Sequence, residues 1–231
     1  MNPLHPKDKE LFDEHPDEIM ESIMLHHPSC VNGTLPHYGP LLNFLIKAST
    51  GVNALEIGVA QGYSSYFMAQ AIKYNNERFK HAGKYIGIDI GDKTEQFEKM
   101  KSMGLPVEFY HMDSLEALPK LKGIEFDFIF QDGYHNTEHC LKELELFYPM
   151  LKGNGDGYLV MHDVYAYCEE YFNEIVLWNK GRHQRDDLWK WDFEYVRFLN
   201  NYGLAICRKM DGYDYEKVFW PEGDCKIPGV M

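Results

Sequence analysis

Side chains that can bind a ligand or move a proton follow short apolar runs at several points along the chain. Such a run is typical of a buried strand, and in an open sheet of parallel strands ligands bind at the carboxyl ends of the strands. We therefore expect these side chains to gather along one edge of a sheet. The set comprises Glu56, Asp89, Asp113, Asp132 and the pair His162-Asp163.

Two carboxylates of this set, Asp132 and Asp163, need a positive group between them. They follow the predicted strands 126–131 and 158–161, and two neighbouring carboxylates repel each other. A divalent cation with oxygen ligands, a Lys or Arg partner, or a raised pKa would each remove this repulsion. The sequence leaves all three solutions open.

Two histidines beside these carboxylates, His135 and His162, are candidates for a general base. An imidazole with an unperturbed pKa of about 6.5 takes up a proton near neutral pH. The alternative for His135 is that it caps the following helix or pairs with Asp132. His135 also begins the string His-Asn-Thr-Glu-His, which fits a zinc-protease motif. We interpret that string as a chance match, because His139 falls among surface-type residues.

The stretch from Asn53 to Ser65 predicts a buried strand, a tight glycine turn and the start of a helix. Gly58, Ala60 and Gly62 stand at alternate positions after the apolar run. Glycine is needed where the backbone takes a positive φ or where a ligand approaches closely. The helix start offers backbone N–H groups and the positive end of a dipole. This stretch is therefore the predicted binding site for a ligand.

The type of ligand follows from the residues of this turn. A dinucleotide-binding fingerprint requires Gly-x-Gly-x-x-Gly, whereas this turn is Gly-x-Ala-x-Gly and is preceded by Glu56. An acid at the strand end repels a pyrophosphate and attracts an ammonium group. A ligand with an amino-acid end and a nucleoside end, such as S-adenosylmethionine (SAM), fits better, and the missing glycine counts against a dehydrogenase. Asp89, at the end of the next predicted strand, suits the ribose hydroxyls.

The segment from Glu56 to Ser64, Glu-Ile-Gly-Val-Ala-Gln-Gly-Tyr-Ser, resembles the first motif of class I SAM-dependent methyltransferases. Its form is typical of the catechol and caffeoyl-CoA type O-methyltransferases. The resemblance runs from about residue 38 to residue 210. Asp-Gly-Tyr-His at 132–135, with His162-Asp163 later, also resembles a class I group that acts on sugars and secondary metabolites.

The resemblance implies which residues bind SAM. In this family the segment at Tyr38 and Gly39 approaches the methionine end, and the position of Asp113 contacts adenine. The alternatives are an ordinary turn at Tyr38 and a helix N-cap at Asp113. The predicted cofactor-binding residues are Glu56, Gly58, Gly62, Tyr63, Ser64, Asp89, Asp113, Ser114 and Tyr38.

The resemblance also implies a metal site at the ends of the fourth and fifth strands. In metal-dependent O-methyltransferases, carboxylates at these positions bind a divalent cation. Asp132 matches the first position, and His162 with Asp163 matches the second, where an imidazole replaces one oxygen ligand. Mg²⁺ prefers oxygen ligands, whereas Mn²⁺ and Fe²⁺ accept an imidazole. The predicted metal ligands are Asp132, His162 and Asp163, and the predicted catalytic residues are His135, His162 and Asp132.

The fold class follows from the alternation of strand and helix patterns, which predicts a parallel sheet with helices on both faces. Strands are predicted at 53–59, 84–90, 107–112, 126–131 and 158–161, and a hairpin at 193–199 and 204–209. The resemblance implies an α/β, Rossmann-like, doubly wound seven-stranded sheet, mostly parallel with an antiparallel C-terminal strand. We predict a single globular domain with an N-terminal helical cap segment (1–33), a methyltransferase domain (34–210) and a C-terminal tail (211–231).

The composition excludes several classes of protein. The chain has 231 residues, of which 45% are hydrophobic, and a net charge of −13, so it suits one full core and disfavours a nucleic-acid partner. No apolar run reaches the roughly 18 residues of a membrane span. The five cysteines are scattered without a Cys-x-x-Cys pair, which indicates a reducing compartment. We expect a cytoplasmic protein, and the family suggests a homodimer.

These observations favour a SAM-dependent methyltransferase that acts on a hydroxyl of a small molecule, with or without the help of a divalent cation (Mg²⁺, Mn²⁺ or Fe²⁺). Two alternatives remain open. One is a metal-independent N-methyltransferase for a small molecule, and the other is a non-catalytic SAM-binding module. The aromatic stretch 187–195 fits either an acceptor pocket or ordinary core packing, and core packing is favoured.

Overall fold

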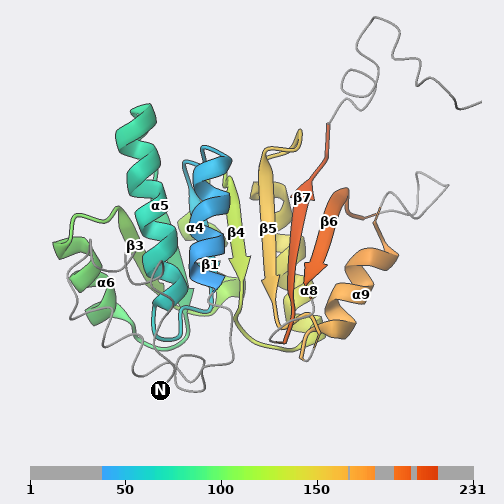
Figure 1. Ribbon diagram of the computed structural model, residues 1–231. Helices are drawn as coiled ribbons and strands as arrows, with labels where there is room; N and C mark the ends of the chain where they lie inside the picture. The colour runs from blue at the N-terminus through green and yellow to red at the C-terminus, as the bar shows by residue number, and fades with distance from the viewer. Residues whose placement is uncertain (1–37, 166, 180–189, 199–201, 213–231) are drawn as a thin grey trace, which may run out of the picture.

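A computed structural model describes residues 38–165, 167–179, 190–198 and 202–212. Their centre is a seven-stranded sheet with the order β3-β2-β1-β4-β5-β7-β6 (Figure 1). The strands are β1 Ala54–Ile57, β2 Tyr85–Asp89, β3 Val107–His111, β4 Phe128–Gln131, β5 Gly157–His162, β6 Phe193–Phe198 and β7 Leu204–Lys209. Only β7 runs antiparallel to its neighbours, β5 and β6. The predicted fold class is confirmed.

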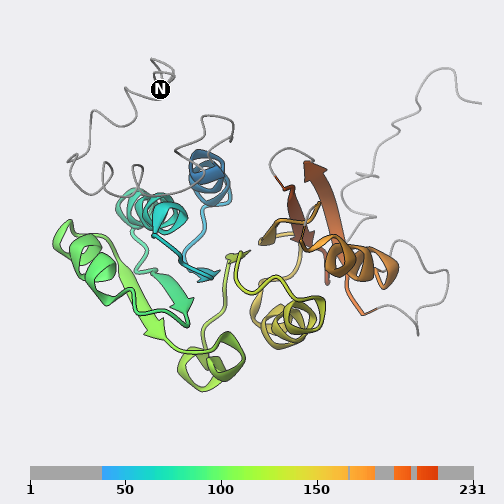
Figure 2. The ribbon, with the colours of Figure 1, turned by 90° about the horizontal axis from the view of Figure 1, so that it is seen from below.

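Helices cover both faces of the sheet (Figure 2). One face carries α4 Tyr38–Ala48, α5 Tyr63–Phe79 and α6 Thr94–Ser102, and the other carries α7 Leu118–Leu121, α8 Thr137–Phe147 and α9 Glu169–Leu177. Two short 3₁₀ helices, η1 Ser114–Glu116 and η2 Tyr148–Met150, complete the described elements. Each face therefore has its own apolar core, as expected of a doubly wound sheet.

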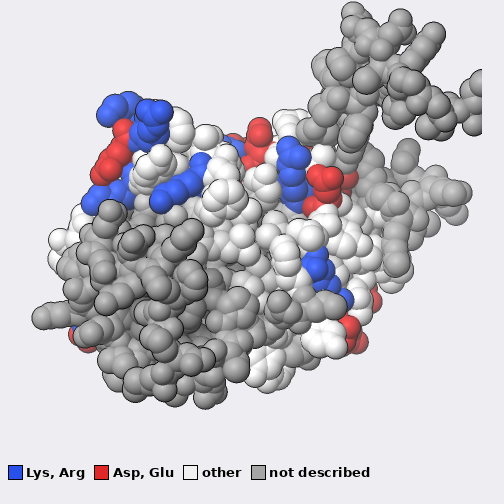
Figure 3. Space-filling view, in the orientation of Figure 1, with Lys and Arg blue, Asp and Glu red and all other residues white. Residues whose placement is uncertain are grey.

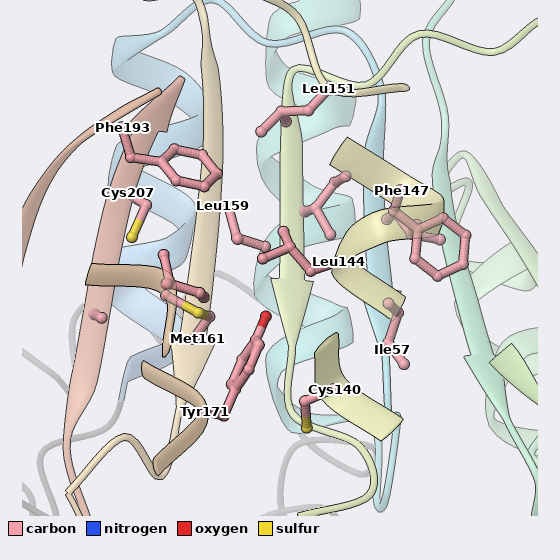
Figure 4. Close-up of a cluster of buried hydrophobic side chains, with 14 of the residues drawn as sticks. Ile57, Cys140, Leu144, Phe147, Leu151, Leu159, Met161, Tyr171, Phe193 and Cys207 are labelled. Atoms are coloured by element: carbon pink, nitrogen blue, oxygen red, sulfur yellow. The ribbon is translucent and has the colours of Figure 1, made fainter. Parts of the chain in front are cut away.

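The apolar spacing of the sequence explains this packing. All four residues of β1 are buried, as expected of a central parallel strand covered on both faces. On α8, residues at helical spacing turn toward the sheet, and Figure 4 shows Leu144 and Phe147 among Ile57 and Leu159 of the strands. This side of the core adjoins the carboxyl ends of β4 and β5.

The main differences from the predicted boundaries have local causes. The predicted strand at 53–59 ends at Ile57, because Gly58 adopts a φ of 87° and starts the turn. The helix predicted to start after the glycine turn runs from Tyr63 to Phe79. Residues 1–33, and the tail beyond residue 212, lie outside the described residues, so the domain boundaries stay predictions. Within the described chain, no helix combines the length and the apolar character needed to cross a membrane.

The register of the parallel strands brings their carboxyl ends to one edge. Ile57 pairs with Ile88 of β2 and with Gln131 of β4, and Gln131 pairs with Met161 of β5. The residues that follow these positions are therefore neighbours at the lower edge of the sheet in Figure 1. This edge holds the candidate site.

Candidate functional site

The turn after β1 is held by its backbone. Gly58, Ala60 and Gly62 have φ angles of 87°, 48° and 81°, so the left-handed conformation recurs at alternate residues. A Cβ on Gly58 would lie 2.3 Å from the backbone oxygen of Asp132, whereas a Cβ on Gly62 would meet nothing within 4 Å. The first glycine is thus required by close packing of two loops, and the second borders open space at the start of α5. The prediction of positive φ at the glycines is confirmed.

Asp89 fastens this turn from the neighbouring strand. Its Oδ2 accepts hydrogen bonds from the amides of Val59 (2.9 Å) and Ala60 (3.0 Å), and its Oδ1 accepts one from Gly91 (2.7 Å). These bonds offset the strain of a positive φ at Ala60. A carboxylate has further lone pairs, so the predicted contact of Asp89 with ribose hydroxyls stays a prediction.

Glu56 lies beneath the turn and is fully buried. Its carboxylate accepts hydrogen bonds from the hydroxyls of Ser64, Ser65 and Tyr85. Burial raises the pKa of Glu56 to about 7, against the opposing effect of these three hydroxyls. The expectation that Glu56 faces a ligand's ammonium group stays a prediction, and the three partners seen here belong to the protein. Glu56 and Ser64 join β1 to the first turn of α5.

The end of β3 also differs in part from expectation. Asp113 caps η1 by accepting a hydrogen bond from the amide of Leu115 (2.8 Å), which confirms the N-cap alternative. Ser114 is buried, donates to Glu143 and lies 3.3 Å from Nε2 of His139. Its predicted contact with the cofactor stays a prediction, and its hydroxyl faces the protein interior. His139 also departs from the surface position expected for it.

Two predicted cofactor residues on the helices take different places. The ring of Tyr63 is 8% exposed and packs at 5.1 Å against Phe67, so it belongs to the core beside the turn. Tyr38 packs edge-on against His162 at 5.1 Å, which places it beside the predicted metal ligands. Gly39 is required by packing, since a Cβ there would lie 2.4 Å from the Phe67 ring.

The ends of β4 and β5 bring together two carboxylates and two imidazoles. Nδ1 of His162 lies 3.0 Å from Oδ1 of Asp132 and 3.2 Å from Oδ1 of Asp163. Nε2 of His135 lies 2.8 Å from Oδ2 of Asp163 and 3.9 Å from Oδ1 of Asp132. We call these four residues the charged cluster. The helix that follows His135 is capped by Asn136, so of the alternatives for His135 the pairing is confirmed and the capping is wrong.

The charged cluster shifts the pKa values of its members. Contacts with Asp132 and Asp163 raise the pKa of His135 to about 10. Burial lowers the pKa of His162, but hydrogen bonds with the same carboxylates outweigh it and raise the pKa to about 10. Burial raises the pKa of Asp163, but hydrogen bonds from both histidines lower it to about 2. Both imidazoles are therefore protonated at neutral pH in this arrangement, and neither accepts a proton there.

The same residues fit a divalent cation. One ligand atom from each of Asp132, His162 and Asp163 can be chosen so that all lie within 4.8 Å of one another. Two carboxylates and one imidazole are ligands that suit Mn²⁺ or Fe²⁺ better than Mg²⁺. Asp163 has a φ of 59°, a sparsely populated conformation of the kind that gathers at functional sites.

Aromatic residues beside the charged cluster were not predicted. Tyr167 stacks on His135 at 5.4 Å with nearly parallel rings, and Tyr202 lies 5.6 Å from Tyr167. Tyr134 is 65% exposed in the loop between β4 and α8. Their types alone give no signal, because tyrosines at such spacing are equally typical of a core. Within the stretch 187–195, Trp191 and Phe193 are buried in the core, as favoured above.

Charged side chains of both signs lie around the end of α5 on the face shown in Figure 3, and others lie toward the lower right of that face. The described surface between these regions carries mostly uncharged residues on this face.

Comparisons with known proteins agree with this geometry. Residues 55–164 match the family model described as a methyltransferase domain. The chain is 30% identical over 159 residues to caffeoyl-CoA O-methyltransferase 1 of Eucalyptus globulus, across 61% of this chain and 57% of that protein. The values are the same for the caffeoyl-CoA O-methyltransferase of Eucalyptus gunnii. The chain thus spans less than two thirds of the length of these relatives.

Solved structures share the fold at low sequence identity. The O-methyltransferase TomG from Streptomyces achromogenes, in complex with SAM, aligns with a TM-score of 0.58 and 17% identity over 85% of this chain and 91% of that one. The methyltransferase PaMTH1 from Podospora anserina, bound to S-adenosylhomocysteine (SAH), aligns with a TM-score of 0.58 and 15% identity over 91% and 99%. Residues 55–164 are thus similar to a methyltransferase domain, and the described fold is shared with known methyltransferases, among them one bound to SAM and one bound to SAH.

Proposed function

We propose that this protein transfers the methyl group of SAM to a hydroxyl group of a small molecule, with the help of a divalent cation. The observation that carries the proposal is the position of the charged cluster. Asp132 packs directly against Gly58 of the turn after β1, so the residues suited to a cation and an acceptor adjoin those suited to SAM. The names of the relatives support the same reaction class.

The cofactor half of the proposed site extends from β1 to β3. Open space beside Gly62 and the start of α5, which has no side-chain cap, suit the amino-acid end of SAM. Asp89 lies where ribose hydroxyls are expected. Ile90, the next residue, is 78% exposed and offers an apolar surface for adenine beside Asp113. SAM supplies a methyl group on a sulfonium, which makes it a good electrophile.

The acceptor half is the charged cluster. Asp132, His162 and Asp163 would hold the cation, and a bound cation lowers the pKa of a hydroxyl that it contacts. His162 must give up its proton to serve as a ligand. His135, which pairs with Asp163 on the other side, then keeps that carboxylate oriented. Tyr38 and Tyr167 border the space with their rings.

The rate of methyl transfer depends mainly on how the acceptor and the methyl donor are positioned. Placing the acceptor in line with the methyl group contributes up to roughly 7–11 kcal/mol in favourable cases. Asp132 would accept a hydrogen bond from the acceptor hydroxyl, and His135 would take up the released proton when it starts unprotonated. His162 could take up that proton only in a reaction without the cation, because it is otherwise a ligand. Catalytic roles for Asp132, His135 and His162 form part of this proposal.

A second candidate is metal-independent methyl transfer to an amine of a small molecule. It is favoured by one observation, since His135 and His162 already neutralise the two carboxylates without a cation. The histidine pair thus supplies, between Asp132 and Asp163, the positive charge that a Lys or Arg partner would otherwise supply.

Calorimetric titration of metal-stripped protein tests both candidates. SAH is titrated first, followed by Mn²⁺, Mg²⁺ and Fe²⁺, into the wild type and Asp132→Ala. Asp156→Ala is the matched control, because Asp156 is an exposed carboxylate that immediately precedes β5, at the end of the strand away from the charged cluster. SAM turnover is then measured with a panel of catechols, sugars and amines.

The proposal predicts micromolar SAH binding in all three proteins, cation binding that only Asp132→Ala loses, and methylation of a hydroxyl. SAH binding with no cation response and methylation of an amine would favour the second candidate. SAH binding without any turnover would indicate a non-catalytic SAM-binding module, and no SAH binding would refute both enzymes.

The remaining expectations belong to the same proposal. They are a methyltransferase domain over residues 34–210, a small acceptor rather than a nucleic acid, a homodimer and a cytoplasmic location. The charge of −13 supports the exclusion of nucleic acid. Light scattering on the full chain tests the dimer.

A further inference from the structure

A series of buried hydrogen bonds lies in the core next to the proposed site, and Glu143 is at its centre. Glu143 belongs to α8 and is 1% exposed. Its Oε2 accepts a hydrogen bond from Nε2 of Gln131 (2.6 Å), and its Oε1 accepts one from the hydroxyl of Ser114. Nε2 of His139 lies 3.1 Å from the same Oε1.

Two of the contacts of Glu143 reach the two halves of the site. Ser114 follows Asp113 at the end of β3, on the cofactor half. Gln131 is the last residue of β4 and precedes Asp132, on the acceptor half. One buried side chain thus bridges two segments that carry different ligands in the proposed function.

The series continues to a third segment of the site. The hydroxyl of Tyr171, on α9, donates a 2.5 Å hydrogen bond to Oε1 of Gln131. The start of α9 is tied to the charged cluster, because the amide of Cys168 donates to the backbone oxygen of Asp163 (2.9 Å). The ends of β3 and β4 are therefore joined to α9 by side chains that are at most 6% exposed, namely Ser114, Gln131, Glu143 and Tyr171. The backbone at the start of α9 continues the connection to the end of β5.

Packing alone does not call for these polar groups. Apart from these polar partners, Glu143 and Gln131 are lined by apolar residues, and Figure 4 shows Ile57, Leu144, Phe147 and Leu159 in this part of the core. Burying a carboxylate there costs free energy that an apolar side chain of similar volume would not. The carboxylate instead fixes the orientation of its partner side chains, because each of its oxygens binds a particular donor.

We propose that Glu143 is a positioning residue, which sets the spacing between the cofactor half and the acceptor half of the site through Ser114 and Gln131. This inference rests on the proposed function. Methyl transfer is sensitive to such spacing, because a displacement of about 1 Å at the reacting groups lowers a rate by about a hundredfold. Glu143 itself touches neither ligand.

The test compares Glu143→Gln with Ser114→Ala and the control Glu145→Gln. A glutamine side chain has the same shape but only one acceptor oxygen, so it cannot accept hydrogen bonds from both Gln131 and Ser114. Glu145 lies on the same helix with its side chain 58% exposed. Steady-state kinetics use SAM and the panel member that the wild type methylates fastest, and SAH affinity is measured by calorimetry.

In Glu143→Gln we expect kcat to fall about tenfold or more, with the KM for SAM and the SAH Kd within about threefold of wild type. Ser114→Ala removes one of the contacts and should lower kcat about threefold. Glu145→Gln should match the wild type. A change in kcat with unchanged cofactor affinity is not expected of a residue that only supports the fold.

Two results would overturn the inference. One is an unchanged kcat in folded Glu143→Gln, and the other is a loss of SAH affinity in parallel with kcat in both variants. A wild-type protein that binds no SAH and methylates no panel member would instead refute the proposed function, and this inference with it. The wild-type measurements therefore separate the two failures.

Discussion

The turn after β1 and the charged cluster lie side by side at one edge of the sheet, but different forces hold them in shape. The turn is fixed by backbone conformation, with positive φ at Gly58 and Gly62 and amides bound to Asp89. The charged cluster is fixed by ionised side chains from the ends of two strands. The turn involves no histidine in these contacts, whereas the charged cluster exists in this form only while both of its histidines carry protons. The turn after β1 with Glu56 and Asp89, which we call the cradle, is thus held mainly by hydrogen bonds, and the charged cluster can change with pH or with a bound cation.

The largest effect is expected from a substitution at one of the two glycines of the cradle. Gly58→Ala places a Cβ 2.3 Å from a backbone oxygen at a φ of 87°, so we expect the free energy of unfolding to fall by about 3 kcal/mol or more. Gly62→Ala meets open space and carries only the strain of its positive φ, at about 1 kcal/mol. Urea denaturation followed by tryptophan fluorescence measures both. Equal losses would contradict the role of the contact between the loops.

A second substitution tests the ionisation of Glu56, the buried acid of the cradle. The folded-state pKa of Glu56 is raised from 4.5 to about 7, so the native state holds a proton that the unfolded state releases between these values. Stability from this group is therefore fully present below about pH 4.5 and is lost as pH rises through about 7, by at most about 3 kcal/mol. Glu56→Gln should remove this slope. Urea denaturation at pH values from 4 to 8 is the measurement, and an unchanged slope would refute the assignment.

The charged cluster should respond with a different pH dependence. Asp163→Asn keeps a residue that tolerates the φ of 59° but removes the charge that binds both histidines. In metal-free protein we expect a loss of about 2 kcal/mol near pH 6, reduced by solvent screening at His135, which is partly exposed. The raised pKa values of about 10 mean that the histidine contribution is full below about pH 6.5 and is lost as pH rises through 10. The deficit of the variant should therefore shrink toward pH 10, and a deficit independent of pH would contradict the ionic account.

The smallest expected effect separates binding from folding in the cradle. Asp89→Ala should weaken SAH binding by on the order of 1–2 kcal/mol, because it removes the predicted ribose partner and loosens the turn amides. Asp92→Ala is the control, since Asp92 is fully exposed and bonds only locally to Thr94. Calorimetry with SAH measures both variants. If the two bind equally, Asp89 serves the turn alone.

The sequence by itself determined the order of the elements and the site's edge. Apolar runs separated by helical patterns set the parallel strands, and glycines 58 and 62 marked positions that need a positive φ. These features depend on a few consecutive residues, so local conformational limits are enough to predict them. The choice of Asp132, His162 and Asp163 as neighbours followed in the same way from the ends of two strands.

Only the tertiary structure decided which partner each polar side chain has. Ser114 turns inward to Glu143, Tyr38 lies on His162, and Glu56 binds hydroxyls of the protein. The contact between Tyr38 and His162 joins residues far apart in the chain, and no local pattern records it. Hydrogen bonds and pKa values depend on burial and on distances of a few ångströms, and these are set only when the helices pack on the sheet.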